Sequence, residues 1–419
     1  MEPDVVAREG PAPTFPGWRV VGAAFVCLTV TSGLGFYGLA AYLTVLVREH
    51  DGSDGGEVWR VGQISGAVAV FFFVGGVFGL IVARQIARHD VRIVVLAGAV
   101  FGAIALLLLG QVTEVWHVYA VYVVLTLGHT CAGLVPAATV VTRWFHVKRS
   151  VALSIASTGL SVGGVLITPF AKWLMDRNGL EDSSKYLALI WFVGIVPVTL
   201  LFMRPHPQAL GWEPDGIRTS AGPPREYFSV ALRDAIRSRF FITVSIAYTL
   251  ILAAQVGGIQ QLVKLVEERT STSTATLATA VLAGTSVVAR LAGGQLAARL
   301  SMAHLALGCA LLQAIALTAI AAFGSTALLL AGIVLFGATV GNLLMLHPLL
   351  IGQEFGPRDY AQIFSRSQFV AFVGTAAGPY VLGAIRDASG GYGTAYAVAG
   401  VMSLVGAAFL PRRVRATET

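Results

Sequence analysis

Charged residues and cysteine are both scarce in this chain. Asp, Glu, Lys and Arg make up 12% of its 419 residues, about half the ~25% that is usual in soluble domains. The three cysteines stand apart in apolar runs, so no disulfide framework or metal cluster is expected. The chain also lacks a GxxxxGK[ST] phosphate loop and the HExxH, GxSxG and CxxC motifs. The sequence therefore predicts no cofactor, no metal site and no enzymatic activity.

Apolar residues dominate instead. They make up 56% of the chain, and the mean hydropathy is +0.75. A chain of this composition must place most of its surface against lipid. The net charge is +7, but the basic residues stand in short gaps between apolar runs, as they do in membrane proteins. We expect an all-α membrane protein whose surroundings are the lipid bilayer, with no nucleic-acid partner.

Twelve apolar segments are long enough to cross a bilayer, which takes about 20 residues. A Pro-rich polar stretch divides them into two sets of six and holds five of the sixteen prolines. The predicted organisation is a tail (1–16), a first six-helix bundle (17–203), a linker (204–237), a second six-helix bundle (238–410) and a tail (411–419). Within the linker, residues 227–237 are either a short amphipathic surface helix or a simple tether. The first apolar run is too long for a signal peptide.

The basic residues also predict an orientation. With the N-terminus inside, the inner side carries about 20 Lys and Arg and the outer side about seven, which is a strong positive-inside bias. Both termini and the linker are then cytoplasmic. The absence of a targeting segment, together with the high Ala, Gly, Val and Arg content, suggests a bacterial plasma (inner) membrane.

The two halves resemble each other. Residues 168–179 and 378–390 share a proline before an Arg/Asp pair and a glycine, and residues 84–92 correspond to 294–304 at an offset of about 211. Parallel six-helix repeats are typical of transporters that bind substrate between the repeats near the midplane. We therefore expect two pseudo-symmetric bundles around a central site.

Arg290 is the strongest single candidate for that site. It stands in the middle of the apolar segment 273–299, where a charge costs roughly 2.5–3.5 kcal/mol on insertion scales. No acidic residue lies deep in a predicted helix to pair with it. A guanidinium binds a carboxylate through two parallel hydrogen bonds, and a single positive charge favours a monoanion. The alternative is a structural salt bridge.

Other polar side chains within the apolar segments complete the candidate site. His129 either binds a carboxylate or carries a proton, or it forms a helix–helix hydrogen bond. His347 precedes Pro348 and is either a gating residue or packs beside a kink. Both histidines are candidates for proton coupling or gating. The remaining candidates for substrate binding are Tyr37, Gln255, Gln260, Ser286 and Asn342.

Three stretches carry a resemblance to a known family. They are PGWRVVGAAFV (16–26), RWFHVKRSVALSIASTGLSVGG (143–164) and SVVARLAGGQLAARL (286–300). The chain resembles the major facilitator superfamily, and within it the monocarboxylate transporters and the bacterial oxalate/formate-antiporter-like proteins. The resemblance implies twelve helices in two bundles. It also places Arg290 where the family has an arginine that pairs with the substrate carboxylate, and Tyr37 at a family tyrosine of the first helix.

Four positions depart from the family pattern. Ala41 stands where animal members have a first-helix Lys, and Ser286 stands where they have an Asp four residues before the arginine. Ala87 and Ala298 replace the loop Asp of the wider superfamily. Two groups that the family implicates in proton handling are therefore missing, so the resemblance alone does not imply proton coupling.

Together these features predict a secondary active transporter of a small monocarboxylate, such as lactate, pyruvate or an aromatic acid. Its expected partners are the carboxylate anion and a proton, and it is expected to be monomeric. Two alternatives within transport stay open: exchange of carboxylate anions, and carriage of an uncharged or cationic solute. A membrane sensor or enzyme is disfavoured because the longest polar segment spans about 35 residues.

Overall fold

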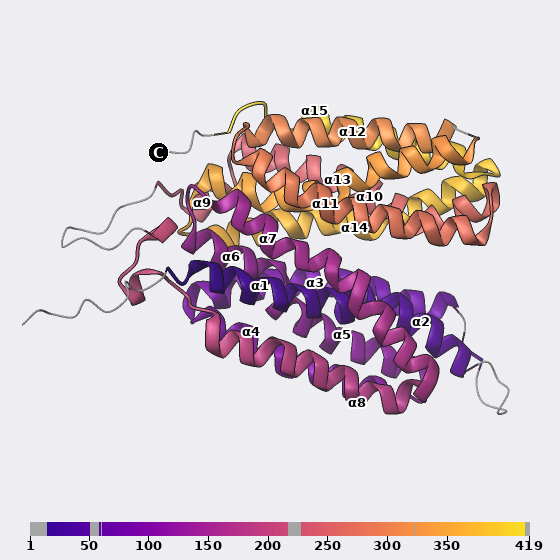
Figure 1. Cartoon of the computed structure of the whole chain (residues 1–419), viewed down its shortest axis with the longest axis horizontal. Helices are drawn as coiled ribbons and strands as arrows, with labels where there is room; N and C mark the ends of the chain where they lie inside the picture. Colours follow the sequence, from indigo (N-terminus) through magenta and orange to yellow (C-terminus); the bar gives the residue numbers. More distant parts are fainter. Residues whose placement is uncertain (1–14, 51–57, 60, 217–227, 323, 415–419) are drawn as a thin grey trace, which may run out of the picture.

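The structure is a computed structural model that describes residues 15–50, 58–59, 61–216, 228–322 and 324–414. Its described residues form helices, turns and loops. Two helical bundles lie side by side, the first in indigo to magenta and the second in orange to yellow (Figure 1). The first half of the chain thus folds apart from the second, as expected for two repeats.

The first bundle contains several interrupted helices. Its elements are α1 (Gly17–Thr31), η1 (Ser32–Phe36), α2 (Gly38–Glu49), α3 (Val61–Arg88), α4 (Val91–Leu109), α5 (Val115–Ala132), α6 (Leu134–Trp144), α7 (Arg149–Val162), η2 (Gly163–Ile167) and α8 (Thr168–Phe202). The segments η1 and η2 are π-helical turns. Such turns often mark functional sites.

The second bundle has longer, continuous helices. They are α10 (Arg239–Arg269), α11 (Thr272–Ala297), α12 (Met302–Ala322), α13 (Thr326–Phe355), α14 (Tyr360–Ser389) and α15 (Tyr392–Phe409). In the chain, the linker between the two bundles contains the short turns η3 (Gln208–Leu210) and η4 (Pro214–Gly216) and the single helical turn α9 (Leu232–Ala235). The described part of the stretch 227–237 therefore contains one helical turn, Leu232–Ala235, in an otherwise non-helical segment, and Tyr227 lies outside the described residues.

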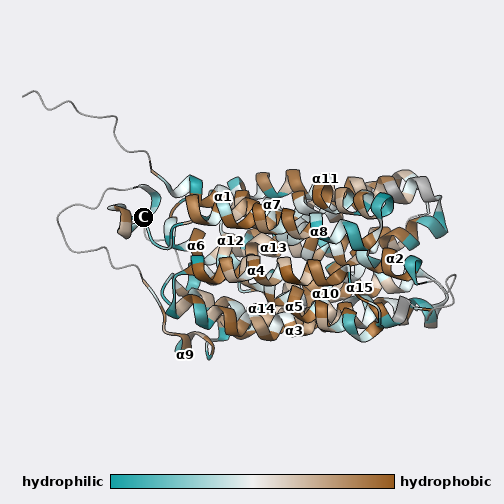
Figure 2. Ribbon diagram, turned by 90° about the horizontal axis from the view of Figure 1, so that it is seen from below, coloured by the Kyte–Doolittle hydropathy of each residue, from teal (hydrophilic) through white to brown (hydrophobic). Residues whose placement is uncertain are grey.

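Eleven helical stretches within the described residues are long and apolar enough to cross a membrane. One of them, Arg149–Phe202, has 54 residues and contains two crossings, because Gly179 adopts a φ of +74° that reverses the chain inside α8. The described residues thus supply the twelve predicted crossings. Apolar residues occupy the middle of the bundles and polar ones gather at both ends (Figure 2), as a bilayer requires.

The linker lies at one end of the molecule, which we call the linker end. Asp215 accepts hydrogen bonds from the backbone N–H groups of His146, Val147 and Lys148, at 2.9, 2.8 and 3.0 Å. Later in the linker, the N–H of Leu232 donates to Asp359 (2.9 Å). The early part of the linker is therefore fastened to the first bundle and the late part to the second.

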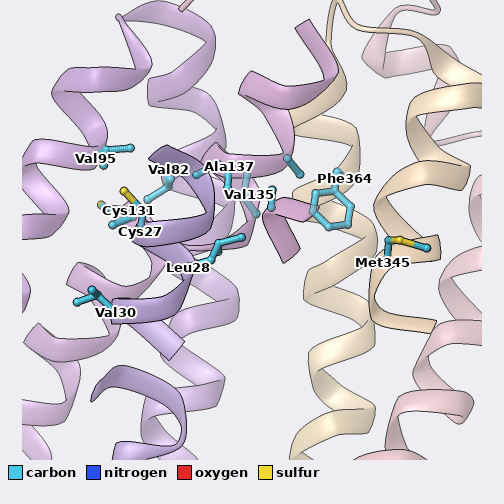
Figure 3. Close-up of a cluster of buried hydrophobic side chains, with 14 of the residues drawn as sticks. Cys27, Leu28, Val30, Val82, Val95, Cys131, Val135, Ala137, Met345 and Phe364 are labelled. Carbon is cyan, nitrogen blue, oxygen red and sulfur yellow. The ribbon is translucent and has the colours of Figure 1, made fainter. Parts of the chain in front are cut away.

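The two bundles pack on each other through α3 against α14 and through α7 against α11. Gly76 of α3 faces Phe369 and Phe372, while Gly294 of α11 faces Ser154. These positions lie in the half of each crossing nearest the linker end. Buried side chains also continue across the contact: Phe364 of α14 stands beside Val135 of α6 (Figure 3). The molecule is therefore closed at its linker end.

Candidate functional site

Arg290 lies where the two bundles meet. Its side chain is only 1% exposed. Nε donates to the carbonyl of Gly341 on α13 (3.1 Å), and Nη1 donates to the carbonyl of Ser157 on α7, in the other bundle. The hydroxyl of Ser154 donates in turn to the carbonyl of Arg290 (2.6 Å). One buried cation therefore joins the bundles through backbone carbonyls.

The charge of Arg290 has no carboxylate partner in the described part of the chain. Every ion pair found there involves other side chains. A guanidinium has five N–H donors, and its two hydrogen bonds to carbonyls leave donors for a further acceptor. A buried charge without a counterion is costly unless a ligand supplies one. This arrangement suits an anionic ligand.

Ser286 and Asn342 stand beside Arg290, between α11 and α13. A Cβ at Gly341 would lie 3.0 Å from both Arg290 Cβ and Ser286 Oγ, and the amide of Asn342 packs over Gly293. Ser286 Oγ and Asn342 Oδ1 are buried without a hydrogen-bond partner among the described residues. Buried polar atoms are usually paired, so two unpaired ones beside an unpaired cation indicate a place for a ligand.

Tyr37 approaches the same arginine from the first bundle. It stands between η1 and α2, packs against Gly164 of η2, and interacts electrostatically with Arg290. Although protein surrounds it, 37% of the residue is exposed, as expected beside an opening. The structure thus brings together Tyr37, Ser286, Arg290 and Asn342.

Two π-helical turns position Tyr37. Thr168 Oγ1, just after η2, donates to the carbonyl of Gly33 (2.8 Å), and Ser32 Oγ donates to the carbonyl of Leu160, just before η2 (2.7 Å). These bonds hold η1 to the residues on both sides of η2. A Cβ at Gly33 would collide with Ile167. The glycines of SGLGF and GGVLI therefore allow the backbones of η1 and η2 to approach each other closely, which larger residues at these positions would prevent.

His129 lies at a second contact between the bundles. Its Nδ1 is 3.1 Å from the carbonyl of Thr31. Since that carbonyl only accepts, Nδ1 carries the proton and Nε2 remains an acceptor. The ring lines a cavity of about 50 Å³ between α3, α5, α6 and α14, together with Gly79 and Gln368. This volume has room for a few water molecules.

The cavity beside His129 is the pseudo-symmetric counterpart of the arginine site. At the repeat offset of about 211, Gly79 corresponds to Arg290 and Gln368 to Ser157. The side chain of Arg290 fills the space between the bundles at its contact, whereas Gly79, which has no side chain, leaves a cavity at the other contact. Gln368 Oε1 is buried there without a partner among the described residues. Gln368 is not among the site residues predicted from the sequence, although the repeat offset could have identified it.

Three predicted site residues lie elsewhere. The amide of Gln255 donates to Gln313 Oε1 (2.8 Å) inside the second bundle, so its hydrogen-bonding capacity is used there. His347 Nε2 is 2.8 Å from Ser367 Oγ, and the ring stacks on Tyr248 within the same bundle. Gln260 is exposed on α10. The structure does not bring these three residues together with Arg290.

Comparison with known proteins identifies the family. The model of the Major Facilitator Superfamily matches residues 25–302. Human monocarboxylate transporter 2 is 26% identical over 190 residues, which are 45% of this chain and 37% of the relative. The MFS transporter asaE of Aspergillus flavus is 25% identical over 193 residues, which are 46% of this chain and 43% of the relative. The matches thus span less than half of each curated relative.

Solved structures agree on the fold. The human organic anion transporter MFSD10 superimposes with a TM-score of 0.72 at 16% identity, covering 96% of this chain and all of that one. The E. coli fucose:proton symporter superimposes with a TM-score of 0.69 at 16% identity, covering 93% and 98%. The family match covers well over half of the chain, and the architecture agrees with it. The chain belongs to the Major Facilitator Superfamily and is a multi-pass membrane protein.

Proposed function

We propose that this transporter carries a small monocarboxylate, of the lactate or pyruvate type or an aromatic acid, and that Arg290 binds its carboxylate. The observation that carries the proposal is the buried guanidinium with no carboxylate partner among the described residues. Two unpaired polar atoms, Ser286 Oγ and Asn342 Oδ1, lie beside it. A relative named monocarboxylate transporter 2 supports the choice of substrate class.

Binding of the anion would change the contact between the bundles. Arg290 now donates across the interface to the carbonyl of Ser157. A carboxylate is a stronger acceptor than a backbone carbonyl for a charged donor, so a bound substrate would compete for that N–H. With a monocarboxylate bound, the site would be neutral. The loaded transporter would then pass through its occluded state at a lower electrostatic cost than the empty transporter, whose site carries a buried charge. The same argument favours monoanions over dianions.

Tyr37 and Ser286 would orient the substrate. Both hydroxyl groups can donate to a carboxylate or to a substrate hydroxyl, and Tyr37 interacts electrostatically with Arg290 from the opposite bundle. Asn342 Nδ2 donates to the carbonyl of Ala338 (2.9 Å), which fixes the amide with its free oxygen as an acceptor. A hydroxy acid could therefore be distinguished from an unsubstituted one.

The coupling ion of the proposed cycle is a proton, with His129 as the candidate carrier because its Nε2 accepts and faces the small cavity. His347 is the less favoured candidate, since Ser367 and Tyr248 already engage its ring. Anion exchange is the competing mode, because Ala41 and Ser286 replace the family's Lys and Asp. Our proposal includes cytoplasmic termini, a monomer and the bacterial inner membrane.

The test is uptake of labelled lactate into proteoliposomes, with and without an inward proton gradient. Arg290→Ala should reduce uptake to background. Arg299→Ala, which removes an exposed arginine just after the same helix, is the matched control and should retain uptake. Loss of transport in both variants, or in neither, would contradict the role of Arg290. Uptake that does not depend on the proton gradient but increases when the proteoliposomes are preloaded with a carboxylate would establish exchange instead.

A further inference from the structure

A second cavity, of about 260 Å³, opens at the linker end. It is distinct from the Arg290 site, and its walls come from the first bundle, the linker and the loop before α14. Most of the lining side chains are basic or polar. They include Thr142, Arg143, His146, Arg149, His206 and Arg358. Three arginines thus line one cavity, and none of its described lining residues is a carboxylate.

Arg149 is the buried member of this group. It is only 5% exposed. Nε donates to the carbonyl of Phe145 (3.2 Å), and Nη2 lies 3.4 Å from His146 Nδ1. Nη1 lies 3.1 Å from the place where a Cβ of Gly352, on α13, would be. Arg149 therefore reaches across from the first bundle to the second.

Three carboxylates near the cavity form hydrogen bonds with other groups. Asp215 interacts electrostatically with Arg149, but its oxygens accept three backbone N–H bonds. Asp90 interacts with Arg143 but is held by Arg92 at 2.7 Å. Asp359 accepts from Leu232. Within the described residues, Arg143, Arg149 and Arg358 form no ion pair. Their three positive charges exceed the two negative charges of Asp90 and Asp215, the carboxylates that interact with them electrostatically, and Asp90 is also paired with Arg92.

The charges are divided between the bundles. Arg143 on α6 and Arg149 at the start of α7 belong to the first bundle, whereas Arg358, just before α14, belongs to the second. Like charges that face each other across a contact repel. An anion between them would turn repulsion into attraction on both sides. Because a transporter of this fold must part its bundles at this end during its cycle, such an anion would hold the linker end closed.

We propose that this basic cavity binds a phosphate-bearing anion, which bridges the two bundles and stabilises the closed linker end. Phosphate fits because arginine forks bind it through paired, charge-assisted hydrogen bonds, and its second charge matches a site with several cations. Two sources share this chemistry: a free phosphomonoester and the headgroup of an anionic phospholipid. Basic pockets between membrane helices bind such headgroups.

Thermal unfolding of the purified full chain tests the proposal without measuring transport. Inorganic phosphate should raise the Tm in neutral detergent more than chloride at equal ionic strength, and the rise should saturate. In Arg143→Gln/Arg358→Gln the apparent Kd for phosphate should weaken at least about tenfold. The control Arg412→Gln/Arg413→Gln removes two exposed arginines near the C-terminus and should respond like wild type.

A lipid arm distinguishes the two sources. The same variants are melted in nanodiscs of phosphatidylcholine with and without phosphatidylglycerol. Stabilisation by phosphatidylglycerol alone would assign the site to a headgroup, and stabilisation by phosphate in detergent would assign it to a free anion. Equal responses of wild type and Arg143→Gln/Arg358→Gln in both arms would overturn the proposal. Arg290→Ala should keep its phosphate response, which separates this result from the proposed transport function.

Closure is tested by distance. Spin labels are attached at Val147→Cys and Leu300→Cys, two exposed positions at the linker end of opposite bundles. Adding phosphate should shift the distribution of distances between the two labels toward shorter values. The shift should be absent in the background of Arg143→Gln/Arg358→Gln. A longer separation with phosphate would contradict the role assigned to the anion.

Discussion

At the scale of single residues, the shape of the Arg290 side chain matters as much as its charge. Its fork reaches two helices at once, Gly341 on α13 and Ser157 on α7. A lysine ammonium is a point charge that cannot make this planar double contact. The site is therefore specific for arginine on geometric grounds.

Arg290→Lys should raise the KM for lactate at least about tenfold, because one charge-assisted hydrogen bond is worth roughly 1.5–3 kcal/mol. The readout is initial uptake at varied lactate concentration, with the amount of folded protein checked by size exclusion. A KM equal to that of wild type would show that charge alone is enough.

At the scale of helices, glycine has opposite effects at the two contacts between the bundles. A Cβ at Gly79 would touch only Thr130 Cγ2, at 4.0 Å, whereas a Cβ at Gly294 would overlap Ser154. The first glycine borders a cavity and the second permits a tight helix contact. The two halves of the repeat thus use glycine for different purposes.

Gly79→Ala should leave the protein as stable or more stable, by up to about 1 kcal/mol, since alanine is the better helix former. Gly294→Ala should lower the Tm, because α7 and α11 must move apart. Differential scanning fluorimetry of the two variants side by side provides the measurement. The reverse order of the two Tm values would refute the packing described at these contacts.

Asp90 begins α4 and stabilises its first turn. Its carboxylate accepts from the N–H of Arg92 (2.9 Å) and from the guanidinium of the same residue (2.9 and 2.7 Å). Burial alone would raise the pKa of Asp90, but these hydrogen bonds hold it below its ordinary value. The wider superfamily's loop Asp is Ala87 here, so Asp90 is the carboxylate of this loop, three residues later.

Asp90→Ala should cost about 1 kcal/mol of stability through loss of the cap, and Asp90→Asn should cost less. The contribution of the charge is fully present above the ordinary pKa of an aspartate and is lost as the pH falls through the lowered value. The Tm difference between wild type and Asp90→Asn should therefore shrink in acid. If the Tm difference stayed constant down to the lowered pKa of Asp90, the stabilisation would not come from the charge of this carboxylate.

At the scale of the whole molecule, the closed linker end leaves Tyr37 on the more open side. It is 37% exposed, whereas Ser154, nearer the linker end, is 1% exposed. A transporter that rocks between two states exposes its site to one side at a time. This difference in exposure predicts that the site opens away from the linker.

Tyr37→Cys should react quickly with a membrane-impermeant maleimide applied to the side opposite the linker, and Ser154→Cys should be protected. The native cysteines at 27, 131 and 309 are buried and provide a low background. Reaction is followed by mass shift in oriented vesicles. Faster labelling of Ser154→Cys would mean that the opposite state dominates in the membrane.

The sequence by itself determined the class of the protein. Long apolar runs, a Pro-rich interruption and a repeat offset predict twelve crossings in two bundles, because bilayer thickness imposes helix length and leaves few alternatives. Arg290 could be selected for the same reason, since an isolated charge in lipid demands an explanation. Both conclusions depend on local composition.

Only the tertiary structure decided which polar side chains meet. Gln255 and Tyr37 look alike in the sequence as polar residues beside glycines, yet Gln255 pairs with Gln313 inside one bundle and Tyr37 approaches Arg290 across two. The direction of a side chain depends on helix rotation, and the turns η1 and η2 shift that rotation in ways that periodicity does not reveal. The basic cavity at the linker end likewise unites residues from 142 to 358, which only the packing of the two bundles brings together.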